Sequence, residues 1–79
     1  MTPGEVLRWR QAQPFTPFRI RLSNNTCYDI THPELCIAGR TYVDIGVPDN
    51  PAEPIAARTI TVALIHVAEL IPLNPGLVA

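Results

Sequence analysis

Four arginines near the start of the chain are the residues whose type and spacing best suit chemistry. Arg19 and Arg21 alternate with apolar residues, so both point to one side of a predicted strand. Arg8 and Arg10 lie in the segment before it, with Trp9 between them. Guanidinium groups contact phosphate oxygens and a tryptophan ring stacks on bases, so these arginines are the candidate nucleic-acid-binding residues. The alternative is a solvent-exposed strand face and a tryptophan that anchors a helix.

The histidines and acidic residues give weaker signals. His32 and His66 are 34 positions apart and form neither a metal-ligand spacing nor a catalytic pair. We expect His32 to cap a turn and His66 to be structural. Asp29, Glu34 and Asp44 are not clustered and accompany no nucleophile motif or glycine-rich loop, so we interpret them as surface charges. The sequence predicts no catalytic residue, no metal and no cofactor.

Two cysteines, Cys27 and Cys36, are too few for a disulfide scaffold and match no zinc pattern. We expect both to be small, buried or half-buried residues in a reducing compartment, with redox sensing as the alternative.

Charge and length exclude several classes of protein. Six arginines and no lysine face seven acidic residues, giving a net charge of −1, so no overall field attracts nucleic acid or anionic membranes. The start resembles no signal peptide and no apolar run approaches the ~20 residues of a membrane span, which predicts a cytoplasmic protein without membrane contact. A chain of 79 residues predicts one domain, residues 1–79, whose marginal core favours support from association.

A short helix is expected to open the fold. Thr2 suits the N-cap, Pro3 the first helical position and Glu5 a capping box, which predicts a helix over about 3–13. Arg10 falls on its apolar side, and we expect its side chain to extend to water or to reach Glu5.

Alternating apolar residues then predict a mainly β domain. Asparagines 24 and 25 suit a tight hairpin, positions 39–40 a bulge or inner turn, and the prolines of 48–57 a solvated loop. Asn74-Pro75-Gly76 is expected to end the ordered part. The predicted strands are about 15–23, 26–31, 36–47, 58–65 and 67–73.

The closing segment, residues 59–73, is the part of the sequence that best indicates the fold. Its alternation breaks at Ile65-His66 and resumes without glycine, asparagine or aspartate at the joint. Two strands joined so sharply suit a small, strongly bent antiparallel barrel. The alternative is another small barrel, or a sheet packed by one helix.

This order of elements resembles the Sm-like fold, the five-stranded barrel of Sm, archaeal Sm-like and bacterial Hfq proteins. Phe18 to Asn25 resembles the family's alternating strand and hairpin, and Leu64 to Pro72 resembles the closing segment of Hfq, where a functional histidine lies near the position of His66. The resemblance implies a ring-shaped RNA-binding oligomer.

The RNA-binding motifs of that family differ here. The Asp-x-x-Met-Asn of Sm proteins is replaced by His32 to Leu35, and their Arg-Gly by Ile65-His66. The chain also resembles short uncharacterised bacterial proteins with a Pro-Phe-x-Pro-Phe-x-Ile-x-Leu opening, here Pro14 to Leu22, and a later His-Pro-Glu. That group implies no activity.

We therefore predict a non-enzymatic, homo-oligomeric binding module that binds RNA or another nucleic acid, with a ring preferred over a dimer. The alternative is a protein-interaction or scaffold module without a nucleic-acid role, and an enzyme is the third hypothesis. The closing strands hold more apolar residues than one barrel face can bury. The predicted oligomer interface is Val62, Ile65, Val67, Leu70 and Ile71.

Overall fold

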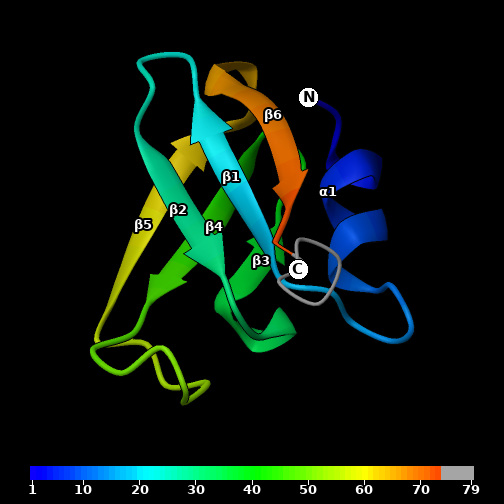
Figure 1. The fold of residues 1–79 in the computed structure, drawn as a ribbon. Helices are drawn as coiled ribbons and strands as arrows, with labels where there is room; N and C mark the ends of the chain where they lie inside the picture. The colour runs from blue at the N-terminus through cyan, green and yellow to red at the C-terminus, as the bar shows by residue number, and fades with distance from the viewer. Residues whose placement is uncertain (74–79) are drawn as a thin grey trace.

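The computed structural model describes residues 1–73, which form one helix, six strands and two 3₁₀ turns (Figure 1). The expected end of the ordered part at 74–76 lies outside the described residues. In chain order the elements are α1 Pro3–Arg10, β1 Phe18–Leu22, β2 Cys27–Ile30, η1 Pro33–Leu35, β3 Cys36–Ala38, β4 Tyr42–Val47, β5 Arg58–Ala63, η2 Leu64–His66 and β6 Val67–Pro72.

The strands form two antiparallel sheets of three strands each, in the orders β2-β1-β6 and β3-β4-β5. This differs from the single closed five-stranded barrel that the sequence predicts. The two sheets are connected by the chain at η1, between β2 and β3, and at η2, between β5 and β6 (Figure 1). The abrupt joint at Ile65-His66 is therefore a 3₁₀ turn that carries the chain from one sheet to the other.

The predicted strand 36–47 is a hairpin of two strands, β3 and β4. Gly39 N donates to Tyr42 O at 2.8 Å and closes the turn. The Tyr42 ring covers Gly39 so closely that a Cβ there would lie 2.4 Å from ring carbons. The glycine thus supplies room for the ring, and of the two expected structures, a bulge or an inner turn, the chain forms the turn.

The helix starts as predicted but ends at Arg10, three residues before the expected end. The Thr2 hydroxyl accepts a hydrogen bond from Glu5 N at 3.3 Å and donates one to Glu5 Oε1 at 3.0 Å. Gln11 caps the other end, its N–H donating to Leu7 O. Eight residues are too few for an isolated helix in water, so α1 depends on packing.

The core lies between the two sheets, with Val6 of α1 closing one side. Phe18 and Ile20 of β1 face Val43 and Ile45 of β4, and none of the four is accessible to solvent. Alternation along β1 places every second residue in this core, as the sequence predicts.

The hairpin between β1 and β2 also matches its prediction. Asn25 adopts φ 71°, the left-handed conformation that asparagine tolerates, and Asn25 N donates to Leu22 O at 2.9 Å. The loop after β4 carries no strand, in agreement with its prolines. No helix among the described residues is long and apolar enough to cross a membrane.

The cap predicts a measurable effect on stability. Thr2→Ala removes both hydrogen bonds to Glu5 and should lower the free energy of unfolding by about 0.5–2 kcal/mol. Thr2→Ser keeps the hydroxyl and serves as the control. Equal denaturant midpoints for the two variants would show that the cap contributes nothing.

The register of β1 predicts a contrast between adjacent residues. Ile20→Ala leaves a cavity in the core and should cost about 2–5 kcal/mol of unfolding free energy. Arg21→Ala removes a solvent-exposed ion pair and should cost about 0–1 kcal/mol. Urea denaturation of both variants measures the difference, and a larger loss for Arg21→Ala would contradict this register.

Candidate functional site

Strand edges are the most distinctive surface of this protein. In an antiparallel pair, successive residues turn their backbone N–H and C=O groups alternately toward the partner strand and away from it. Each three-stranded sheet therefore has two edges whose outward groups need another partner, water or a cover.

No strand in the part of the chain that the structure describes pairs with the outer edge of β5. β5 pairs with β4 in the register that places Val62 opposite Val43, and Leu64 N donates to Thr41 O at 2.9 Å in the same register. Because every second residue of a strand faces the same neighbour, the backbone groups of Ile60 and Val62 also point toward β4. Those of Thr59, Thr61 and Ala63 face outward, and the side chains of these three residues are exposed.

Within residues 1–73 no strand pairs with the outer edge of β6, whose last residue, Pro72, shares a groove with Arg8 and Trp9 of α1. Leu73 N donates to Pro17 O at 2.7 Å, in the register that pairs Ile71 with Arg19. Ile71 therefore faces β1, while Leu70 turns its N–H and C=O outward. Pro72 occupies the next outward position, where a residue without an N–H costs the sheet no hydrogen bond.

The edge of β3 is covered by the helix. Arg10 Nε donates to the carbonyl oxygen of Cys36 at 2.5 Å, and Cys36 is a position whose backbone groups face away from β4. Arg10 therefore contacts this strand edge and forms no ion pair with Glu5 within residues 1–73. The residue is half-buried there.

Of the five predicted interface residues, two lie in the protein's own core. Val62 and Val67 are buried against the core cluster, and Leu70 and Ile71 are half-buried. Ile65 is 84% exposed at the tip of η2, between the open edges of β5 and β6. The apolar surface near these edges therefore comes from Ile65, with contributions from Leu70 and Ile71.

The arginines of β1 are paired with carboxylates on neighbouring strands. Arg19 Nε lies 2.7 Å from Asp29 Oδ1, directly opposite on β2. Arg21 Nε lies 2.5 Å from Glu69 Oε1, directly opposite on β6, and Arg21 Nη1 also donates to Asn25 Oδ1 at 3.0 Å. The hydrogen bond to Asp29, followed by the charge of that carboxylate, raises the pKa of Arg19.

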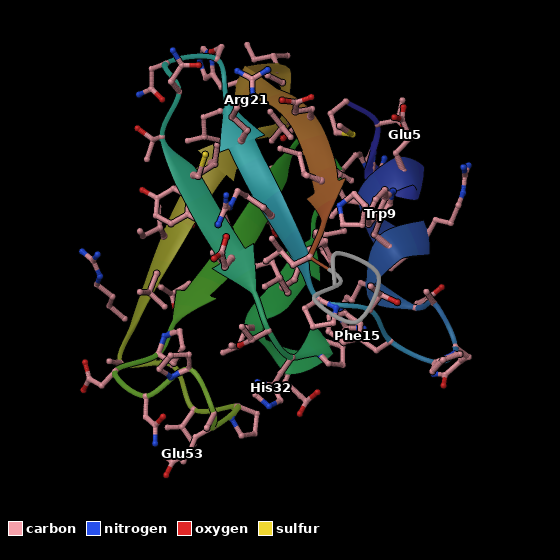
Figure 2. All side chains as sticks on the ribbon, in the orientation of Figure 1. Glu5, Trp9, Phe15, Arg21, His32 and Glu53 are labelled. Carbon is pink, nitrogen blue, oxygen red and sulfur yellow. The ribbon has the colours of Figure 1, made fainter. Side chains whose placement is uncertain are left out.

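The two arginines of α1 do not extend this stripe. Arg10 binds the edge of β3, and Arg8 is exposed on the helix. Trp9 packs against Phe18, with ring centroids 5.5 Å apart, and Figure 2 shows it on the side of α1 that faces the strands. Trp9 is thus an anchor of the helix, and the four candidate arginines form no single positive surface.

Within residues 1–73 neither histidine forms an ion pair with a carboxylate that could serve as a catalytic partner. His32 occupies the N-cap position of η1, but its ring makes no capping hydrogen bond and instead lies 3.2 Å from the Thr31 hydroxyl. The turn is closed by the backbone, since Leu35 N donates to His32 O. His66 borders a groove lined by no carboxylate. Within residues 1–73 no three histidine, cysteine or acidic side chains gather as metal ligands.

Comparison of the chain with models of protein families, with curated proteins and with solved structures found no match.

The resemblance to Sm-like proteins implies that the fourth predicted strand, 58–65, of one copy pairs with the fifth, 67–73, of the next, and the predicted interface was placed on apolar side chains of these two strands. One local signal was available: Thr59, Thr61 and Ala63 form the polar or small half of an alternating strand. The cover on β3 had no local signal, because Arg10 and Cys36 are 26 positions apart.

The two cysteines predict different reactivity toward thiol reagents. Cys27 is exposed, whereas burial raises the pKa of Cys36 to about 11, opposed only in part by the charge of Arg10. Native protein at neutral pH should therefore react at Cys27 alone, and denatured protein at both cysteines. Mass spectrometry after iodoacetamide treatment measures this, with Cys27→Ser as the control that should stay unmodified when native. Rapid labelling of native Cys36 would contradict the burial described.

Proposed function

We propose that the protein is a non-enzymatic interaction module that self-associates when the edge of β5 in one copy pairs with the edge of β6 in the next. The observation that carries the proposal is the pair of open edges on the two sides of η2. Extended backbone on such edges gains hydrogen bonds when another strand is added. Exposed Ile65, which lies between the edges, would be covered by the same contact.

A contact between two different edges is heterologous, because the two surfaces that meet are not the same. Any open assembly built from it therefore has one free edge of each kind at its ends. Such contacts repeat until a ring closes or a filament grows. A ring therefore suits this protein better than a two-fold dimer, in which one edge would have to pair with its own copy.

The connectivity supports an Sm-like arrangement of the protomer. When β2 and β3 are taken as two halves of one bent strand interrupted by η1, the neighbour order β6-β1-β2/β3-β4-β5 is that of a single five-stranded sheet. The helix before β1 and the 3₁₀ joint before β6 also correspond to the family's order of elements. We propose the Sm-like fold on this basis.

Protein is favoured over nucleic acid as the partner. Arg19 and Arg21 are paired with carboxylates, Arg10 binds a carbonyl oxygen, and these contacts would have to break before a phosphate could bind. An exposed ion pair is weak enough to exchange, but it adds no net positive charge to attract a polyanion.

The edge of β5 gives a sharp test of assembly. Thr59→Pro removes an outward-facing N–H without removing a hydrogen bond to β4, whereas a proline at Val62 would disrupt the sheet itself. We expect light scattering to show an oligomer for the native protein and a mass near the 8.7 kDa of one chain for Thr59→Pro.

Thr59→Ala is the matched control, because it removes the same side chain and keeps the N–H. It should remain oligomeric, and circular dichroism should show that all three proteins are folded. A native protein that is monomeric at tens of micromolar would overturn the proposal. Ultraviolet absorbance typical of nucleic acid in the purified oligomer would instead support the RNA-binding alternative.

A further inference from the structure

The edge of β2 borders a groove that the self-association described above does not use. The groove has a volume of about 480 Å³ and lies between β2 and the ends of β4 and β5, beside the loop that follows β4. Its floor includes Tyr28 and Ile45, and Pro48 and Pro51 line the loop side. Because proline supplies no N–H, neither of these two residues can donate a backbone hydrogen bond to the edge of β2.

The outward backbone groups of β2 belong to Cys27 and Asp29. Leu22 N donates to Thr26 O at 2.8 Å, and the same register pairs Tyr28 with Ile20. Alternation therefore turns Tyr28 toward β1 and turns the N–H and C=O groups of Cys27 and Asp29 away from it. Among residues 1–73 β2 pairs with β1 alone, and both outward residues line the groove.

The groove carries one positive charge that the described residues leave unpaired. Arg19 and Asp29, both in its lining, neutralise each other at 2.7 Å. Arg58, at the start of β5, is exposed and forms no ion pair within residues 1–73. An extended segment lying along β2 would thus meet a free strand edge and a guanidinium that binds carboxylates.

We propose that this groove binds an extended acidic segment of a protein partner, which adds as a strand to the edge of β2 and places a glutamate or aspartate against Arg58. The backbone of Cys27 and Asp29 supplies the main-chain hydrogen bonds, and Arg58 selects the charge. Tyr28 and the two loop prolines supply the apolar surface on which alternate side chains of the segment rest.

Two synthetic peptides test the proposal. They are Thr-Val-Glu-Val-Glu-Val-Thr and its lysine counterpart Thr-Val-Lys-Val-Lys-Val-Thr, each titrated into isotopically labelled protein and followed by amide NMR shifts. The acidic peptide should shift Cys27, Asp29 and Arg58, and the basic peptide should not. Equal binding of both peptides, or no shift in this groove with either, would overturn the proposal.

Variants separate the charge from the backbone edge. Arg58→Gln should weaken binding of the acidic peptide about tenfold, since it removes one charge-assisted hydrogen-bonding partner. Cys27→Pro should abolish binding by removing an outward N–H, whereas Cys27→Ser keeps that N–H and should bind like the native protein. Undiminished binding by folded Cys27→Pro would contradict strand addition.

A third probe and the oligomeric state keep this proposal distinct from the proposed function. Tighter binding of oligouridine than of the acidic peptide at the same amides would overturn it in favour of a nucleic-acid groove. Ala63→Pro removes an outward N–H of β5 away from the groove, at a residue whose φ of −65° suits proline, and it should prevent assembly while leaving acidic-peptide binding unchanged, so loss of assembly and loss of peptide binding are separate results. Peptide shifts confined to Thr59, Thr61 and Ala63 would show that β5 is the peptide site and would overturn the assignment to β2.

Discussion

The hydrogen-bonding groups along strand edges are the constraint on which this small fold depends. Two three-stranded sheets have four edges, and these edges have three different surroundings. A side chain of α1 contacts β3, a groove borders β2, and within residues 1–73 no strand pairs with the outer edges of β5 and β6. A strand from another chain would satisfy the backbone groups of these last two edges.

The arginines of β1 form ion pairs across the sheet and so help to align its strands. Arg19 and Arg21 stand directly opposite carboxylates on the two neighbouring strands, so each ion pair favours the observed register over a slip by one residue. Each pair is half-exposed and contributes little to total stability. The main electrostatic consequence is that the outer face of this sheet carries balanced charge.

Local patterns predicted the features that depend on neighbouring residues. The Thr2 cap, the alternation of β1 and the turn at Asn25 follow from propensity and sterics within a few positions. The sequence left positions 39–40 as either a bulge or an inner turn, because the close packing of the Tyr42 ring on Gly39 is visible only in three dimensions. The pairing of the fourth and fifth predicted strands between copies came from the resemblance to Sm-like proteins alone, because the exposure of an edge depends on which distant segments become neighbours.

Because Arg10 of α1 donates to the carbonyl oxygen of Cys36, the edge of β3 is covered only while α1 is packed on the sheets. The helix has eight residues and is stable only while Val6 and Trp9 remain packed. Local unfolding of this helix therefore uncovers β3 in the same event, before the core is lost. Exposure of the β3 edge is then governed by the opening equilibrium of α1, whereas the edges of β5 and β6 are available for pairing without any unfolding.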